Sequence, residues 1–147
     1  MDDAAVISKI LAETFAEYEP LYSPEAFAVM TPGESEIKGR FNDAGEVWVA
    51  ELDGEIVGTI SVIPRDGSLY IRSLAILPAA QGLRIGERLL EKTEKYAVDS
   101  GFEVLTLSTG EFLPHARRLY YRFGFALAGI NDFYGTSLIK MEKCLKS

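Results

Sequence analysis

Residues 73–90, which read SLAILPAAQGLRIGERLL, constrain the fold of this chain more than any other segment. An apolar run ends at Pro78, a short loop with Gly82 and Gly86 follows, and apolar side chains then recur every three or four positions. This order predicts a buried strand, a turn and an amphipathic helix. The first turn of such a helix has unpaired backbone N–H groups and the positive end of the helix dipole. The segment therefore predicts a binding site for an anion, typically a phosphate.

The residues before this junction predict two helices and an antiparallel β-meander. We expect helices over residues 3–18 and 24–30, the second capped by Ser23, and then a loop over 31–45 with one helical turn around Ile37. Asp53-Gly54 and Asp66-Gly67 are two-residue hairpin signals, because both turn positions need a positive φ. The expected strands of the meander are 47–52, 55–63 and 69–77.

The residues after the junction predict a βαβ unit and two closing strands. We expect a helix over 82–100 that ends at Gly101, a strand over 104–108, a helix over 114–123, and closing strands over 125–127 and 137–143. A strand, a crossover helix and a second strand place the two strands parallel, with a right-handed connection. The chain therefore reads as one mixed α/β domain over residues 1–147.

Composition narrows the class of protein. The net charge of −7 argues against nucleic-acid binding, which usually needs a basic surface. No apolar run approaches the roughly 20 residues that span a bilayer, so we expect no membrane partner. The acidic start, Met1-Asp2-Asp3, resembles neither a signal peptide nor a transit peptide, and one cysteine, Cys144, leaves no internal disulfide. These features predict a cytoplasmic protein.

The loop at residues 81–86 does not identify its ligand by itself. It lacks the Gly-x-Gly-x-x-Gly pattern of dinucleotide-binding folds, and it follows several antiparallel strands rather than the first strand. No Gly-Lys-Ser/Thr follows it, as a Walker loop would require. A glycine pair at a strand-to-helix turn is also often a tight turn alone, so both readings stay open at this point.

A second motif, one strand downstream, gives the loop a context. Residues 116–125 read ARRLYYRFGF and match Ala-x-x-Leu/Phe-Tyr-x-x-x-Gly-Phe at Ala116, Leu119, Tyr120, Gly124 and Phe125. Together with the loop pattern Gln/Arg-x-x-Gly-x-Gly/Ala, this helix resembles the GNAT superfamily of N-acetyltransferases over about residues 3–143. The resemblance implies a GNAT-like α/β fold, in which the meander precedes a βαβ unit with splayed parallel strands.

The chain departs from that family pattern at three places. Arg84 stands where the family usually has glycine; an αR backbone would accommodate it, and its guanidinium could then meet a phosphate. Leu113 stands where an asparagine often precedes the helix. The family also usually begins with a short strand, whereas this chain reads as helical from the start.

The resemblance implies a coenzyme site on the strand end and the loop. The diphosphate of acetyl-coenzyme A would rest on backbone N–H groups of residues 82–87, and residues 74–76 would hold the pantetheine arm and the thioester carbonyl. The implied cofactor-binding residues are Leu74, Ala75, Ile76, Gln81, Gly82, Leu83, Arg84, Ile85, Gly86 and Glu87. Arg84, Arg88 and Lys92 form a basic helix edge that either attracts the 3′-phosphate or pairs with Glu87 and Glu91 in solvent.

Catalytic residues are implied for two proton transfers. Tyr120 is expected to act as general acid toward the departing thiolate, because a thiol has a pKa of about 8.5 and a phenol about 10. Its neighbour Tyr121 is expected to be structural. The base that accepts the amine proton is Glu111 or His115, the latter at a helix start that would keep it neutral. No metal site is expected.

The acceptor is predicted to be a small-molecule or peptide amine that attacks acetyl-coenzyme A directly in a ternary complex. Its pocket would be framed by Phe15, Tyr18, Tyr22, Phe27 and the loop 131–134, with a negative rim from Glu17, Glu19, Glu25 and Asp132. The alternative function is a non-catalytic acyl-coenzyme A-binding or sensing domain, and a third is a nucleotide-binding α/β protein. An exposed closing strand is compatible with a homodimer.

Overall fold

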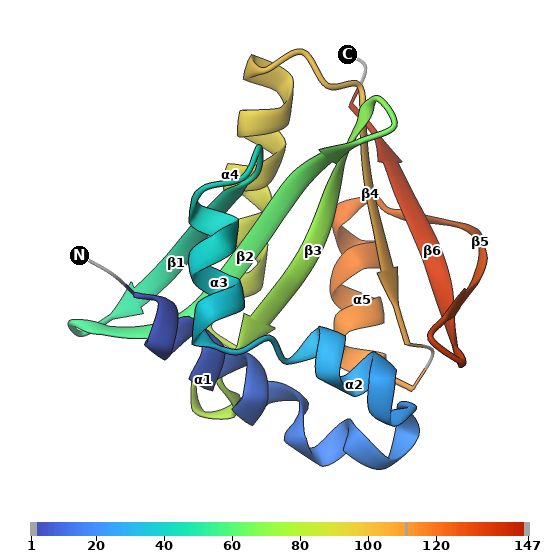
Figure 1. Cartoon of the computed structure of the whole chain (residues 1–147). Coiled ribbons are helices and arrows are strands. Elements are labelled where there is room, and N and C mark those ends of the chain that lie inside the picture. The colour runs from blue at the N-terminus through green and yellow to red at the C-terminus, as the bar shows by residue number, and fades with distance from the viewer. Residues whose placement is uncertain (1–2, 111, 146–147) are drawn as a thin grey trace.

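The computed structural model describes residues 3–110 and 112–145 and shows a twisted sheet between two layers of helices (Figure 1). In chain order the elements are α1 (Ala4–Phe15), the 3₁₀ helix η1 (Ala16–Leu21), α2 (Pro24–Met30), α3 (Glu34–Phe41), β1 (Glu46–Leu52), β2 (Glu55–Arg65), β3 (Ser68–Ile76), the 3₁₀ turn η2 (Pro78–Ala80), α4 (Ile85–Asp99), β4 (Val104–Thr109), α5 (Pro114–Phe123), β5 (Ala126–Phe133) and β6 (Thr136–Cys144).

The sheet has the strand order β1-β2-β3-β4-β6-β5, and its central neighbours β3 and β4 are parallel. These two strands pair at three positions, where residues 69–71 of β3 face 105–107 of β4. Beyond Ile71 they separate, and Figure 1 shows the widening gap between their carboxyl ends. The predicted α/β class, the meander, the βαβ unit and the splayed parallel strands are confirmed.

A β-bulge interrupts the pairing of β3 with β2 shortly before the gap. Ser61 faces Ser73, but Val62 faces Ile71, so Arg72 is an extra residue on β3. Side chains normally alternate between the faces of a sheet, and the extra residue resets that alternation. Leu69 and Ile71 before the bulge, and Leu74 and Ile76 after it, therefore all pack into the same core.

Each face of the sheet is covered by its own helices. The helices α4 and α5 enclose a core that includes Ile60, Leu69, Leu90, Leu105 and Met141, all fully buried. On the opposite face, α1 and α3 enclose a second cluster around Leu11 and Ile37, which Ala75 of β3 joins. Figure 1 shows α1, α2 and α3 in front of the sheet and α4 and α5 behind it. The gap between β3 and β4 lies between these two layers.

The expected helical turn around Ile37 is present but longer than predicted, since the two-turn helix α3 takes up residues 34–41 of the expected loop over 31–45. Glu36 Oε1 accepts a hydrogen bond from the Gly33 N–H at 2.9 Å, which satisfies a backbone donor at the helix start. Ile37 is 1% exposed and anchors the helix in the cluster under α1. One apolar residue in a polar stretch is a weak helical signal, so tertiary packing decides this element.

The expected closing strand over 125–127 is present but was predicted too short, since β5 runs from Ala126 to Phe133. Asn131, Asp132 and Phe133 therefore belong to a strand rather than to a loop, and the turn is Tyr134-Gly135 with φ of 50° and 88°. Its full length gives no alternating hydrophobic pattern in the sequence, because β5 is an edge strand that is exposed on both faces and shifted in register between Leu127 and Gly129. The other two hairpins are confirmed, with positive φ at Asp53, Gly54, Asp66 and Gly67.

The first helix is shorter than expected, because α1 ends at Phe15 and continues as the 3₁₀ helix η1, which contains Pro20. In the part of the chain that the structure describes, every helix is too short or too polar to cross a membrane.

Ser23 links α2 to the hairpin between β5 and β6, more than 110 residues away in sequence. Its hydroxyl accepts a hydrogen bond from the Ala26 N–H at 3.1 Å, which confirms it as the N-cap of α2. The same hydroxyl donates to the Tyr134 carbonyl at 2.5 Å, and the Ser23 N–H donates to Thr136 Oγ1 at 2.8 Å. This serine therefore fixes both the start of α2 and its position against the hairpin.

Replacing Ser23 by alanine is expected to lower the free energy of unfolding by about 1–2 kcal/mol, because a helix cap and a tertiary hydrogen bond are lost together. Urea denaturation followed by circular dichroism measures this change. Ser35→Ala, at an exposed serine of α3, is the matched control and is expected to change stability by less than about 0.5 kcal/mol. Equal effects of the two substitutions would show that Ser23 does not hold α2 in place.

Candidate functional site

A cavity of about 770 Å³ lies where β3 and β4 separate, between the carboxyl end of β3, the start of α4, and one side each of α1 and α5. Nine of the ten predicted coenzyme-binding residues line it: Leu74, Ala75, Ile76, Gln81, Gly82, Arg84, Ile85, Gly86 and Glu87. The tenth, Leu83, does not line the cavity, and its side chain is 54% exposed. The topology thus brings the strand end and the loop together around one space.

The backbone of β3 turns alternate residues toward this cavity. The Leu77 N–H donates to the Val57 carbonyl across the β2 side, so by alternation Ile76 and Leu74 direct their backbone groups to the side that β4 has left. The Ile76 carbonyl confirms this direction, since it accepts from Gln81 Nε2 at 3.3 Å and from Thr14 Oγ1 at 3.4 Å. Ala75 faces β2 with its backbone and reaches the cavity wall with its side chain.

The expectation of an αR backbone at Arg84 is wrong: the residue has φ 64° and ψ 20°, in the left-handed region, at the N-cap of α4. Gly82 also has a positive φ, of 87°. Burial of Leu89 and Leu90 fixes the position of α4, so the chain must reverse direction between Gln81 and Ile85. A left-handed residue followed by a helical one turns successive N–H groups toward one concavity, which is a geometry that binds anions.

Gly86 allows the start of α4 to approach α5. A Cβ atom at this position would lie 2.8 Å from Leu119 Cδ2, closer than such atoms pack. Gly86 is buried, and its neighbours in the first turn of α4 have no partner for their N–H groups inside the helix. The glycine therefore keeps unpaired donors at the edge of the cavity while the two helices touch.

Tyr120 lies on α5 and lines the cavity although only 6% of its surface is exposed. Its ring packs edge-on against Phe125, with the ring centroids 5.8 Å apart. Burial raises the pKa of the Tyr120 hydroxyl well above its usual value of 10, and the nearby phenols of Tyr22 and Tyr70 raise the pKa further. The hydroxyl is therefore protonated at neutral pH and can donate a hydrogen bond into the cavity.

Two arginines of α5, which the sequence analysis did not assign to the site, line the cavity beside the loop. Arg118 and Arg122 are four residues apart, so they lie on one side of the helix, and this spacing was the signal that could have found them. Arg122 Nη2 is 2.7 Å from Glu87 Oε1 and joins the first turn of α4 to α5. Lys92, by contrast, lies 5.6 Å above the Trp48 ring at β1, away from the loop, so the expected basic edge does not continue to it.

The wall opposite the loop comes from α1 and η1. Phe15 and Tyr18 line the cavity as part of the expected acceptor pocket, together with Thr14 and Glu17. Tyr22 and Phe27 do not line it; the buried Tyr22 packs edge-on against Phe112, and burial raises the pKa of Tyr22 to about 12.

Three further positions bear on the chemistry. Leu113 is 7% exposed and forms apolar cavity wall where the family often has asparagine. Glu111 lies outside the described residues, as does the side chain of His115, whose backbone is in the first turn of α5; both stay predictions as the base. Among residues 3–110 and 112–145, no group of three His, Cys, Asp or Glu side chains is placed to hold a metal ion.

Comparison with known proteins agrees with this geometry. The model of the Acetyltransferase (GNAT) family matches residues 7–125. The Escherichia coli K12 protein YjgM, which is named as an N-acetyltransferase, is 28% identical over 130 residues, which are 85% of this chain and 77% of that protein.

Two solved structures share the fold. The PaiA N-acetyltransferase of Thermoplasma acidophilum, in complex with coenzyme A, has a TM-score of 0.79 and 20% identity, with 97% of this chain and 92% of that chain covered. An acetyltransferase of Elizabethkingia anophelis with acetyl-CoA bound has a TM-score of 0.67 and 24% identity, with 78% and 84% covered.

Replacing Arg84 by glycine is expected to raise the free energy of unfolding by about 0.5–1 kcal/mol, because a left-handed backbone costs an L-residue more than glycine loses in entropy. Arg88→Gly, four residues later inside α4, is the matched control and is expected to lower stability by about 1 kcal/mol. Urea denaturation of both variants measures the two values. A loss of stability at Arg84 as large as that at Arg88 would contradict the strained backbone described above.

Proposed function

Because the chain belongs to the GNAT acetyltransferase family, we propose that it transfers the acetyl group of acetyl-coenzyme A to an amine acceptor. One observation carries this proposal: the end of β3 that β4 leaves unpaired, the start of α4 and Tyr120 all border one cavity. A thioester cofactor with a diphosphate needs all three: the strand end and Tyr120 at its thioester, and the helix start at its diphosphate, at the other end of the pantetheine arm.

The loop and the start of α4 would hold the coenzyme by its diphosphate. Backbone N–H groups of Ile85, Gly86 and Glu87 have no partner inside the helix, and the helix dipole adds positive potential there. Arg118 and Arg122 add side-chain charge from α5. Gln81 supports the loop through its bond to the Ile76 carbonyl. The related structures from T. acidophilum and E. anophelis, which hold coenzyme A and acetyl-CoA, support this assignment.

The end of β3 would orient the thioester. The backbone groups of Leu74 and the N–H of Ile76 face the gap that β4 leaves, so they can hydrogen-bond the pantetheine arm as a strand would. A neutral amine attacks the carbonyl carbon, so a C–N bond forms and the negative charge moves to the carbonyl oxygen. Backbone N–H donors aimed at that oxygen would stabilise the tetrahedral intermediate.

Tyr120 would assist departure of the thiolate. When the intermediate collapses, the C–S bond breaks and the sulfur takes the electron pair. A thiol has a pKa of about 8.5, so the leaving sulfur needs a hydrogen-bond donor more than a strong acid. Burial keeps the Tyr120 hydroxyl protonated for that purpose. The proton of the attacking amine goes to a base, for which Glu111 and His115 stay the predicted residues.

The alternative function, a non-catalytic acyl-coenzyme A-binding domain, has the same cavity but no acceptor. Release of free thiol from acetyl-coenzyme A across a panel of amines separates the two. We expect amine-dependent thiol release that follows saturation kinetics in both substrates. Tight binding of acetyl-coenzyme A with no amine-dependent release would favour the non-catalytic alternative, and tighter binding of ATP or NAD than of coenzyme A would favour a nucleotide-binding protein.

Two further expectations accompany the proposal. A homodimer stays a prediction; the edge strand β5 supports it, since Leu127 and Ile130 are exposed there. A cytoplasmic location stays a prediction from composition.

Tyr120→Phe is expected to lower kcat about 10- to 100-fold and to leave the Kd for acetyl-coenzyme A within about twofold, because the hydroxyl acts on the leaving sulfur and the ring keeps its packing. Stopped-flow thiol release gives kcat, and isothermal titration gives the Kd. Tyr121→Phe, at the neighbouring exposed tyrosine, is the matched control and is expected to change neither value. An unchanged kcat in Tyr120→Phe would remove this residue from the mechanism.

A further inference from the structure

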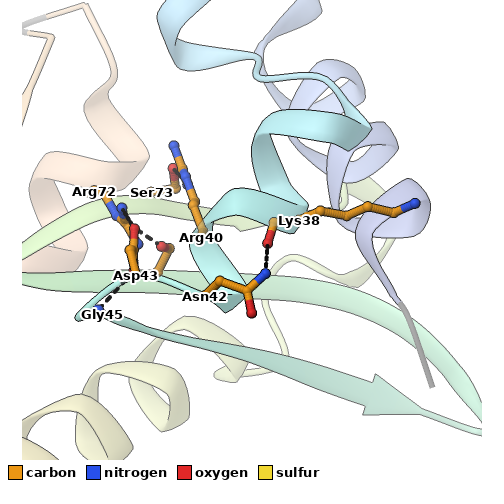
Figure 2. A network of polar contacts seen from close by, with 8 residues as sticks. Lys38, Arg40, Asn42, Asp43, Gly45, Arg72 and Ser73 are labelled. Carbon is orange, nitrogen blue, oxygen red and sulfur yellow. Dashed lines mark hydrogen bonds and ion pairs between the residues drawn. The ribbon is translucent and has the colours of Figure 1, made fainter.

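Two arginines meet on the helix-α3 side of β3, next to the segment that would hold the thioester (Figure 2). Arg72, the extra residue of the β-bulge, donates from Nη1 to Asp43 Oδ2 at 2.8 Å and from Nε to Ser61 Oγ at 3.2 Å. Arg40, near the end of α3, reaches β3 and donates from Nη1 to Ser73 Oγ at 2.9 Å. The two guanidinium groups thus have different kinds of partner.

Arg40 has no carboxylate in direct contact. Asp43 pairs with Arg72 and also accepts from the Gly45 N–H at 2.8 Å, so its carboxylate is occupied. Among residues 3–110 and 112–145, no carboxylate lies within ion-pair distance of Arg40, whose bonded partner is a neutral hydroxyl. Burial, and then the charge of Arg72, lower the pKa of Arg40 to about 10, while the charges of Asp43 and Glu36 act in the opposite direction. Arg40 is therefore a partly buried cation whose direct partner is a neutral hydroxyl.

The position of Arg40 relates it to the acceptor side of the cavity. It lies one helical turn after Ile37, which shares a buried cluster with Ala75, and its partner Ser73 lies two residues before Ala75 on β3. Ala75 and Phe15 line the cavity, whereas Arg40 and Ser73 do not. Two residues of strand span about 6.6 Å, so Ser73, to which Arg40 is bonded, lies about that far along β3 from the cavity wall.

The same face of β3 continues away from the cavity into a second hollow. Tyr70 lies on that face, beyond Ser73, and borders a polar hollow of about 470 Å³ together with Thr106, Ser108 and Asn131. Tyr70 also acts on the pKa of Tyr120, so both hydroxyls lie near the same gap between β3 and β4. Ser73 thus lies on β3 between Ala75, which lines the cavity, and Tyr70, which borders a polar surface that can take the rest of an acceptor.

We propose that Arg40, with Ser73, is the specificity-determining pair that binds a carboxylate of the acceptor, so that the acceptor is an amine that also carries a carboxylate, such as an amino acid. A guanidinium presents two parallel N–H groups that match a carboxylate, and the carboxylate of the acceptor would be the anion in direct contact with Arg40. Glu17, on the cavity wall at the α1 side, fits the amine end of such a zwitterion. This inference rests on the acetyltransferase function proposed above.

The first test compares free amino acids with the matched amino-acid amides as acceptors for the wild-type protein, by thiol release from acetyl-coenzyme A. We expect kcat/KM for the best acid to exceed that for its amide about tenfold or more, because the amide cannot form the ion pair with Arg40. Equal use of acids and amides, or a preference for amides, would overturn the proposal without any mutation.

The second test uses variants of α3. Arg40→Gln is expected to lower kcat/KM for acids about tenfold while amides change less than about twofold, and Arg40→Lys is expected to keep part of the preference. Lys38→Gln is the matched control: it removes one positive charge from the same helix at an exposed position that pairs with Glu34, and is expected to leave the preference intact. An equal loss for acids and amides in Arg40→Gln would show a structural role alone.

A third measurement separates this inference from the proposed function. If no amine is acetylated, the proposed function fails, but titration of N-acetyl amino acids and their amides into the protein loaded with coenzyme A still reports on Arg40. Binding of the acids that is at least about tenfold weaker in Arg40→Gln supports the carboxylate site. Binding that is absent, or equal in both proteins, overturns it.

Discussion

The separation of β3 from β4 is the constraint on which the rest of the structure depends. A strand in the middle of a sheet normally has both edges hydrogen-bonded, but β3 loses one partner after Ile71. Backbone groups cannot stay unpaired in a protein interior without cost, so the gap has to be filled by something that hydrogen-bonds as a strand does. Thr14 and Gln81 satisfy the Ile76 carbonyl at the end of the gap, and the groups before it are left for a ligand.

The two helix layers border that gap from opposite faces of the sheet. On one side, α4 and α5 are joined by Gly86 against Leu119 and by the Glu87–Arg122 ion pair. On the other side, α1, α2 and α3 pack against the sheet, with Leu11, Ile37 and Ser23 among the contacts. The proposed coenzyme side and the proposed acceptor side are therefore built from separate helices.

Local signals in the sequence were enough to predict most of the framework. The hairpins at Asp53-Gly54 and Asp66-Gly67, the cap at Ser23 and the strand–loop–helix junction depend on residues adjacent in the chain. Elements that depend on distant partners were predicted too short or in the wrong conformation. The helix α3 is held by one buried isoleucine, β5 has no buried face, and Arg84 is left-handed because the packing of α4 requires it.

The candidate site shows the same difference between local sequence signals and contacts of residues far apart in the chain. Nine of the ten residues predicted to bind the coenzyme, in the strand end and the loop, line one cavity, and Leu83 is the exception. Their binding of a coenzyme stays a prediction. Arg118 and Arg122 were missed although their spacing was visible. The Arg40–Ser73 contact joins residues 33 positions apart, so no local sequence pattern could predict it. The base candidates fall where the structure describes no side chain, so their roles were not tested.

The bulge at Arg72 has a consequence for how such a strand can evolve. Leu69 and Ile71 share a core with Leu74 and Ile76 because one extra residue lies between the two pairs. Regular pairing of all these residues with β2, without the bulge, would turn every side chain after Arg72 to the opposite face, so Leu74 and Ile76 would face α1 and Ala75 would face α4. Deleting Arg72 would instead restore regular pairing and keep those faces. The bulge can therefore absorb the loss of one residue from β3, whereas a further insertion would need a second bulge to keep Leu74 and Ile76 in the core.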